Sequence, residues 1–170
     1  MTFQIGEGFS GEGANAAHVN TMLGSKDGAV ANAWTTALAT PRAGHVPFVV
    51  VVKPNVPVKP MTLFVNKATV EDAGGPHARL TWGAAQAGVA AGVVAAVRKG
   101  VVAPEDAHDV LLVAAVWVNP AADDEEAVYA NNATATLAAL VAGRDDAPSL
   151  RTVFDAGPPE NPYFRTHDDG

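Results

Sequence analysis

The stretch from Trp82 to Lys99 constrains the fold most, because it is built almost entirely from alanine, glycine and valine. Thr81 is suited to capping the start of a helix there, and Gly100 to taking the left-handed conformation just past its end. The basic pair at its last positions is favoured by the negative pole of the helix dipole. Because small side chains on every face let neighbours approach closely on several sides, we predict a central helix packed against a sheet.

Five segments predict the strands of that sheet. The two strongest are uninterrupted apolar runs, Phe48 to Val52 and Val110 to Val118, which are typical of buried strands. Met61 to Val70 predicts another strand. Thr2 to Phe9 and Ala16 to Leu23 predict two shorter strands around a glycine turn.

The remaining segments predict two further helices and a stiff connection. Apolar residues recur at helical spacing from Ala29 to Ala39. The acidic group Asp123 to Glu126 opens a final helix, which runs to about Ala142 and is closed by Gly143. Three prolines between Lys53 and Pro60 predict an extended connection, because proline cannot donate a hydrogen bond to a sheet.

This order of strands and helices predicts an α/β or α+β sandwich. No internal repeat and no low-complexity linker divides the chain. We therefore assign residues 1–146 to a single domain and residues 147–170 to a polar, proline-rich tail, with Tyr163 and Phe164 as its expected anchor.

Composition excludes several classes of protein. The formal net charge is −7 and the pI is near 5.0, which disfavours nucleic-acid partners because those binders concentrate lysine and arginine on one face. The chain has no cysteine, which excludes disulfides, thiolate zinc sites and cysteine nucleophiles. Its beginning lacks the pattern of a secretory signal, so we expect a cytoplasmic protein. The longest weakly polar run, Gly83 to Val97, falls short of the ~20 residues of a spanning helix, so we expect no membrane segment.

Charge is divided unevenly along the chain. Residues 1–100 hold eight Lys and Arg against five Asp and Glu, whereas residues 101–170 hold three against thirteen. On general grounds, acidic residues in such a pattern form the ordinary solvated surface of helices and tail.

A lone histidine, His18, lies among the small residues of the segment GEGANAAHVN. An imidazole can give or take a proton near neutral pH, and Gly11 and Gly13 would let backbone and ligand approach it closely. From local sequence alone, a structural or surface histidine is the commoner outcome. The segment Gly6 to Gly11 also matches the GxGxxG pattern of dinucleotide sites, but no helix follows it, so turn glycines are favoured.

Three polar side chains on predicted strands and helices also bear on function. Lys67 and Thr69 share one face of a strand, so they form either a polar patch for a ligand with acceptor atoms or, more commonly, part of a solvent face. Gln86 interrupts the apolar central helix, and a buried glutamine there bonds either to backbone or to a ligand. The five histidines show no metal-binding spacing, so no metal site is predicted.

Several short motifs, in order and spacing, resemble the formaldehyde-activating enzymes, which condense formaldehyde with tetrahydromethanopterin to give the methylene derivative and water. The matching pieces are Gly6-Glu7, Gly11-Glu12-Gly13, Ala17-His18, Pro54-Asn55-Val56-Pro57-Val58-Lys59-Pro60, Asn66-Lys67-Ala68-Thr69, Gly83-Ala84-Ala85-Gln86-Ala87-Gly88-Val89 and Ala121-Ala122-Asp123-Asp124. The resemblance runs from about Gly6 to Gly143, while the tail matches poorly. No single piece is decisive, whereas the ordered set is rather specific.

The resemblance implies a fold and an assembly. Members of the family have an α+β fold, a two-layer β-α-β sandwich similar to the second domain of ribosomal protein S5, and they form homopentamers with sites between neighbouring subunits. Such a ring would use the charge asymmetry of this chain if the basic side of one subunit met the acidic side of the next. The shared fold does not imply RNA binding here, because the net charge opposes it.

The resemblance also implies roles for individual residues. By position, His18 is the catalytic proton donor, Lys67, Thr69 and Gln86 contact the pterin, and Val49 lines the site. The implied activity is that of a carbon-oxygen hydro-lyase in one-carbon metabolism and formaldehyde detoxification. It needs no metal and no permanently bound cofactor, because tetrahydromethanopterin or another reduced pterin is a co-substrate.

The chain departs from the family pattern near the histidine and the glutamine. The family has a carboxylate two residues after the histidine, where this chain has Asn20, which keeps the hydrogen-bond geometry without the charge. We retain Asn20 as a substrate-binding residue. Ala84 and Ala87 replace the proline and histidine of typical members. Two functions follow: a formaldehyde-activating lyase, or a non-catalytic pentameric protein that binds or senses a pterin or a one-carbon adduct.

Overall fold

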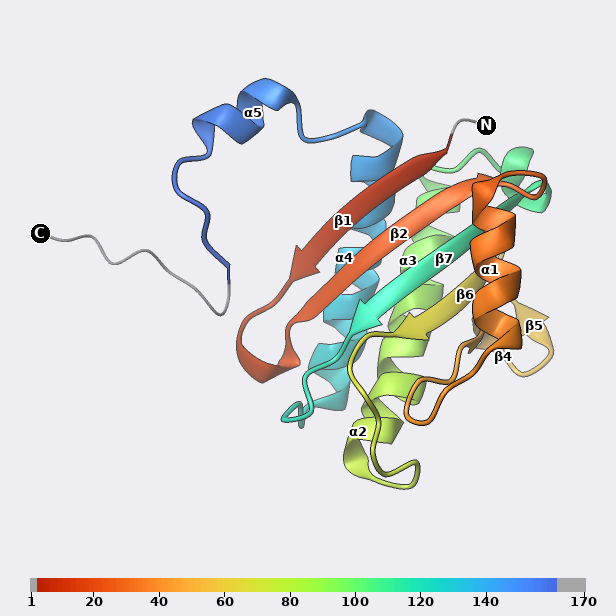
Figure 1. Cartoon of the computed structure of the whole chain (residues 1–170), viewed down its shortest axis with the longest axis vertical. Helices are drawn as coiled ribbons and strands as arrows, with labels where there is room; N and C mark the ends of the chain where they lie inside the picture. Colours follow the sequence, from red (N-terminus) through yellow and green to blue (C-terminus); the bar gives the residue numbers. More distant parts are fainter. Residues whose placement is uncertain (1–2, 162–170) are drawn as a thin grey trace, which may run out of the picture.

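The computed structural model of the chain describes residues 3–161, which form an α+β fold built on a mixed sheet of five strands (Figure 1). The order across the sheet is β1-β2-β7-β6-β3, and all neighbouring strands are antiparallel except β6 and β7, which are parallel. The strand bounds are Gln4–Ser10 for β1, Ala17–Ser25 for β2, Phe48–Val49 for β3, Met61–Asn66 for β6 and Val110–Trp117 for β7. The predicted anchor at Tyr163 and Phe164 lies outside the described residues.

Helices cover the two faces of the sheet unequally (Figure 1). Helices α3 and α4 lie side by side across one face, while α1 covers only one end of the other face. The helix bounds are Ala29–Ala39 for α1, Pro76–Arg79 for α2, Gln86–Arg98 for α3, Glu125–Asp145 for α4 and Leu150–Asp155 for α5, with short 3-10 turns at Gly13–Asn15 and Asp106–His108. Much of one sheet face therefore stays free of helices among the described residues.

The core lies between the sheet and the α3–α4 layer. Each strand turns alternate side chains to this layer, so Val19 and Leu23 of β2 are fully buried while their neighbours face the other way. The prediction of close approach around the alanine- and glycine-rich helix is confirmed. A Cβ atom added at Gly88 would stand 2.8 Å from the Asn132 side chain, so the backbones of α3 and α4 meet across glycine.

Two helix boundaries predicted from sequence are wrong. The central helix begins at Pro76, whose missing N–H suits a first helical position, and not after Thr81. Thr81 lies inside a π-helical segment, Leu80–Ala85, that joins α2 to α3, and its side chain is buried. The last helix does not end at Gly143. It runs on to Asp145 and closes at Asp146, which takes the left-handed conformation with φ of 50°.

The apolar run from 48 to 52 is not one buried strand. Its first two residues form the edge strand β3, and the chain then leaves the sheet to form β4, Val51–Lys53. The segment predicted as an extended connection instead folds back, because Asn55 takes the left-handed conformation that a tight turn requires, and β5, Val56–Pro57, pairs with β4. Val52 is consequently 55% exposed.

The strand β6 ends at Asn66, four residues before its predicted end. The Asn66 side chain donates hydrogen bonds to the carbonyl oxygens of Gly44 (2.7 Å) and Ala68 (2.8 Å), which draws the chain out of the sheet. The strand predictions for the segments that contain β1, β2 and β7, and the helix prediction for 29–39, are confirmed within a few residues.

One helical run in the described part of the chain, Pro76–Arg98, is long and apolar enough to cross a membrane by length and composition alone. This helix is longer than the run from Gly83 to Val97 that the sequence suggested, because it starts earlier than predicted. Of the 18 most apolar consecutive residues of this helix, 61% are buried inside the protein, as is typical of a core helix.

Candidate functional site

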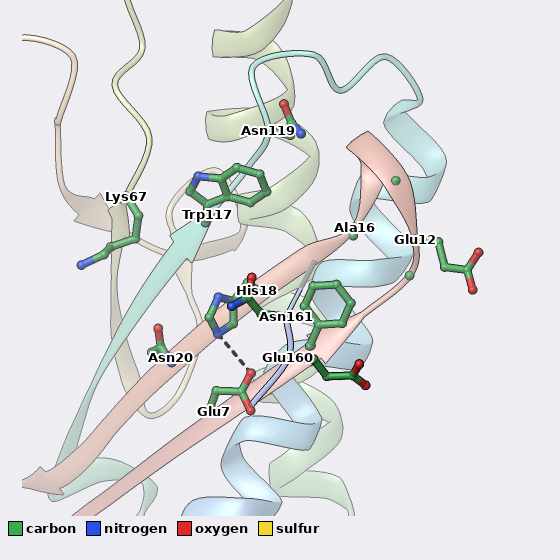
Figure 2. Close-up of a pocket in the computed structure, with 13 residues that line it drawn as sticks. Glu7, Glu12, Ala16, His18, Asn20, Lys67, Trp117, Asn119, Glu160 and Asn161 are labelled. Atoms are coloured by element: carbon green, nitrogen blue, oxygen red, sulfur yellow. Dashed lines mark ion pairs between the residues drawn. The ribbon is translucent and has the colours of Figure 1, made fainter. Parts of the chain in front are cut away.

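A cleft of about 1310 Å³ opens on the sheet face that α3 and α4 do not cover (Figure 2). Strands β1 and β2, the loop between them, the ends of β6 and β7 and two residues of the C-terminal segment contribute to its walls. The lining residues are Glu7, Phe9, Gly11, Glu12, Gly13, Ala16, His18, Asn20, Lys67, Trp117, Asn119, Glu160 and Asn161. Three of the residues singled out from sequence, His18, Asn20 and Lys67, are thus brought to one cleft.

His18 faces the cleft because of its place on β2. Its neighbours Ala17 and Val19 are fully buried beneath the helices, so the alternation of the strand turns His18 and Asn20 to the open face. The imidazole Nε2 atom lies 3.0 Å from a carboxylate oxygen of Glu7, and the two side chains are 44% and 61% exposed. The ring of Phe9 stands edge-on to the imidazole with centroids 6.3 Å apart.

Glu7 and Phe9 alternate with Gly6 and Gly8 along β1, so the glycines face α4 while the two larger side chains face His18. A Cβ atom at Gly8 would overlap the Ala135 carbonyl group and stand 2.8 Å from the Ala139 nitrogen, so β1 packs directly on the backbone of α4. The prediction that the glycines of this segment serve a turn is therefore wrong for Gly6 and Gly8. It is confirmed for Gly11, whose φ is 85°.

Asn15 fixes the loop at one end of the cleft, a role that sequence reasoning missed. Its side-chain nitrogen donates to the Asp123 carboxylate at 3.0 Å, and its oxygen accepts from the backbone nitrogens of Asp123 and Asp124 at 3.0 and 3.2 Å. The side chain of Asn131 in turn donates to the Asn15 carbonyl oxygen at 2.9 Å. The loop before His18 is thereby tied to the start of α4.

Lys67 and Trp117 form the opposite wall (Figure 2). The Lys67 backbone nitrogen donates to the Val116 carbonyl oxygen at 2.7 Å, which continues the β6–β7 pairing past the end of β6 and places Lys67 beside Trp117. Trp117 is paired with His18 in the sheet register. Sequence analysis did not single out Trp117, because only the pairing of β2 with β7 brings it to the histidine.

The other three residues expected at the site do not line this cleft within one chain. Gln86 is 7% exposed and bonds to backbone at both ends of its amide, donating to the Val51 carbonyl oxygen at 3.2 Å and accepting from the Val51 nitrogen at 3.3 Å. Thr69 contacts His45, with 3.0 Å between the hydroxyl and Nε2. Val49 lies in the edge strand β3, where it pairs with Leu63 of β6.

The charges of the cleft are mixed. Glu7, Glu12 and Glu160 bring carboxylates, while Lys67 brings one ammonium group and His18 a titratable ring. Among residues 3–161, no three His, Asp or Glu side chains gather in a way that could hold a metal ion. The carboxylates, the ammonium group and the imidazole can transfer protons and form hydrogen bonds to a polar organic molecule.

Comparisons with known proteins identify the family of the chain and several relatives. The family model described as "Formaldehyde-activating enzyme (Fae)" matches residues 5–160. The chain is 37% identical over 153 residues to a bifunctional enzyme Fae/Hps of Methanosarcina mazei, covering 90% of this chain and 38% of that protein. It is 40% identical over 150 residues to the protein of the same name from Methanococcoides burtonii, covering 88% of this chain and 37% of the relative.

A relative of more similar length was also found. The chain is 36% identical over 150 residues to the 5,6,7,8-tetrahydromethanopterin hydro-lyase of Methanosarcina barkeri, covering 88% of this chain and 83% of that protein. The chain spans less than two fifths of the length of the bifunctional relatives, at 37–38% of the two above. Because the family model matches nearly the whole described chain, the protein belongs to the formaldehyde-activating enzyme family.

Proposed function

We propose that this chain condenses formaldehyde with tetrahydromethanopterin, giving the methylene derivative and water. The observation that carries the proposal is that the imidazole of His18 lines an open cleft of about 1310 Å³. The family match over residues 5–160 supports it. A relative of comparable length carries the name of a tetrahydromethanopterin hydro-lyase. The activity is thus that of a carbon-oxygen lyase.

His18 would supply the proton that the reaction needs. A secondary amine of the pterin adds to formaldehyde to give a carbinolamine, whose hydroxide is a poor leaving group. Protonation of that oxygen by the imidazolium lets it depart as water and leaves an iminium ion. The second nitrogen of the pterin then attacks the iminium carbon and gives up its own proton, which restores the acid. A positioned general acid is typically worth about 10²–10⁴ in rate.

The rest of the acceleration would come from holding the reacting atoms together. Lys67 and Asn20 border the same cleft as His18 and can hydrogen-bond the carbonyl and amino groups of a pterin. Binding that fixes two nitrogens near one carbon lowers the entropic part of the barrier. This role of the two side chains is a proposal that rests on their position and on the family resemblance.

We extend the proposal to the assembly. Val49, Thr69 and Gln86 are assigned to the site by resemblance, yet they lie outside the cleft of their own chain, so a site shared between copies would be needed to join them to His18. The sheet face around β1 supports such an interface, because it carries the exposed side chains of Phe3 and Ile5. A homopentamer is the assembly that the family resemblance favours.

Mass measurement in solution tests this assembly. We expect light scattering on the full chain to give a mass of five times the 17.4 kDa of one chain. A monomer that persists at micromolar concentration would contradict the shared site. Addition of salt during the measurement separates the charge-based interface from an apolar one, because salt screens exposed charges.

Some finer expectations belong to the same proposal. They are the likeness of the sandwich to the second domain of ribosomal protein S5, the division into a domain of residues 1–146 and a tail of 147–170, a cytoplasmic location, and a reaction without a permanently bound cofactor. The strand and helix order supports the first of these at the level of an α+β fold, and the family match runs past residue 146 into the tail.

Stopped-flow kinetics test the reaction directly. Formaldehyde is mixed with tetrahydromethanopterin with and without the full chain, and formation of the methylene derivative is followed by absorbance. We expect the protein to raise the initial rate well above the uncatalysed rate, with tetrahydrofolate as a second carrier to define specificity. Equal rates with and without protein, for both carriers, would rule out the proposed lyase activity.

A second function is favoured by one residue. By the family resemblance, Asn20 stands where members have a carboxylate, so this chain lacks a charge two residues after the histidine. A cleft that binds the pterin or its one-carbon adduct without turnover would then carry or sense it. In the same stopped-flow instrument, saturable binding of tetrahydromethanopterin without any gain in rate identifies this alternative.

A further inference from the structure

We propose that Glu7 is a positioning residue for His18: it fixes the proton of the ring on Nε2 and so makes Nδ1 the nitrogen that delivers the catalytic proton. The inference rests on the proposed function for its kinetic consequence, while its structural part concerns the imidazole alone. It gives a role to a residue that the resemblance leaves without one.

The contact that carries this inference is the 3.0 Å distance between Glu7 Oε1 and His18 Nε2. The two residues come from neighbouring strands, and the register of β1 with β2 sets Glu7 opposite Asn20 and Phe9 opposite His18. Glu7 therefore reaches His18 diagonally across the strand pair, a separation that long side chains span. Figure 2 shows the imidazole lying between Glu7 and Trp117, with its dashed contact on the side of Glu7.

The chemistry of the pair decides where the proton sits. An ionised carboxylate only accepts hydrogen bonds, so Nε2 must carry a hydrogen whenever the contact is made. In the neutral ring, Nδ1 is then the bare nitrogen. In the imidazolium, Nδ1–H is the proton that can leave without breaking the contact to Glu7.

The proton balance of the reaction follows from this assignment. The Nδ1–H bond breaks as the proton passes to the carbinolamine oxygen, which leaves as water. His18 is left neutral with its hydrogen on Nε2. The proton released by the second pterin nitrogen after ring closure returns to Nδ1, so one turnover consumes no net proton.

The position of Glu7 is secured by its backbone. Gly6 and Gly8 on either side pack against the backbone of α4, and the Ser10 hydroxyl donates to the Asn131 side chain at 3.4 Å, so β1 is held in place along its length. The Glu7 side chain itself is 61% exposed. Its replacement by glutamine is therefore expected to leave the fold intact, since exposed ion pairs add little to stability.

Asn20 leaves Glu7 without a second carboxylate opposite it in the strand register. A carboxylate at position 20 would stand directly opposite Glu7 in the strand register, and like charges directly opposite each other repel. With asparagine there, Glu7 is the carboxylate that the described structure places on the imidazole.

The test compares the wild-type chain with Glu7→Gln and with the matched control Glu105→Gln, an exposed glutamate just before the Asp106–His108 turn and away from the cleft. Long-range proton–nitrogen NMR of the imidazoles is recorded at alkaline pH, and kcat and KM are measured with formaldehyde and tetrahydromethanopterin. We expect the Nε2–H tautomer in the wild type and in Glu105→Gln, and a mixture of both tautomers in Glu7→Gln.

For the same variants, Glu7→Gln should lower kcat by about 10- to 100-fold, a part of what a positioned acid supplies, while KM changes less than about 3-fold. A wild-type ring in the Nδ1–H tautomer, or a Glu7→Gln variant with wild-type kcat, would overturn the proposal. If the wild-type chain has no lyase activity, the proposed function fails, and the NMR comparison still decides whether Glu7 sets the tautomer.

Discussion

Replacement of His18 by alanine is expected to lower the enzymatic rate by about 10²–10⁴-fold, toward the uncatalysed rate, because it removes the general acid. The carbinolamine would still form, since addition of an amine to formaldehyde needs no strong acid. Its breakdown to the iminium ion would become limiting. The measurement is single-turnover stopped-flow with the protein and tetrahydromethanopterin both in excess over formaldehyde, which separates the dehydration step from product release.

The control for this variant is His108→Ala. His108 is exposed and lies just before β7, whereas the cleft is formed at the other end of that strand, so its loss should leave kcat unchanged. Both variants should fold, because the side chain of His18 is itself 44% exposed. A His18→Ala chain that keeps the wild-type rate would show that another group protonates the leaving oxygen.

Gly8→Ala is expected to cost about 3 kcal/mol or more of the free energy of unfolding, the upper end of what overpacking costs. The added methyl group would overlap the Ala135 carbonyl group and lie 2.8 Å from the Ala139 nitrogen, so a strand or a helix backbone must move. For a domain of this size, such a change lowers Tm by roughly 6–12 °C. Calorimetry or thermal melting by circular dichroism measures it.

Gly83→Ala is the matched control. It lies in the Leu80–Ala85 segment, and a Cβ atom there would meet nothing within 4 Å. Alanine should raise the stability by about 0.5–1 kcal/mol, because it loses less backbone entropy on folding than glycine does. Equal melting temperatures for Gly8→Ala and the wild type would mean that β1 and α4 do not pack through backbone contact.

Local sequence predicted the elements of this fold better than their ends. The buried strand at β7 and the helix at 29–39 were found because their patterns are long and agree with the final packing. Thr81 was a reasonable cap by residue type, but the helix starts at Pro76, six residues before its predicted first residue, and Thr81 is buried inside it. Gly143 serves packing, since a Cβ atom there would lie 3.3 Å from the Ile5 backbone. Packing of Gly143 against β1, which no local pattern records, accounts for the later end of the last helix, whereas the earlier start of the central helix carries the local signal of Pro76.

The candidate site could be predicted only in part, because some of its contacts depend on how distant strands pair. His18 and Asn20 could be placed on one face by strand alternation, and the structure adds Lys67 to that face through the pairing of β6 with β7. Glu7 and Trp117 could not be found, because each meets His18 only through the register of a neighbouring strand. Alternation in the segment that forms β1 would have put Glu7 and Phe9 on a common face, opposite the glycines.

The order of strands has a consequence for how the protein is made. Strand β7 lies between β2 and β6 although it is the last of the five in the sequence, so the sheet cannot close until residues 110–117 have left the ribosome. The hairpin of β1 and β2 can pair early, because its contacts are local, but its partner comes from distant sequence and arrives late. Until then the nascent chain exposes the apolar faces of β2 and β6, which is when a chaperone would have most to protect.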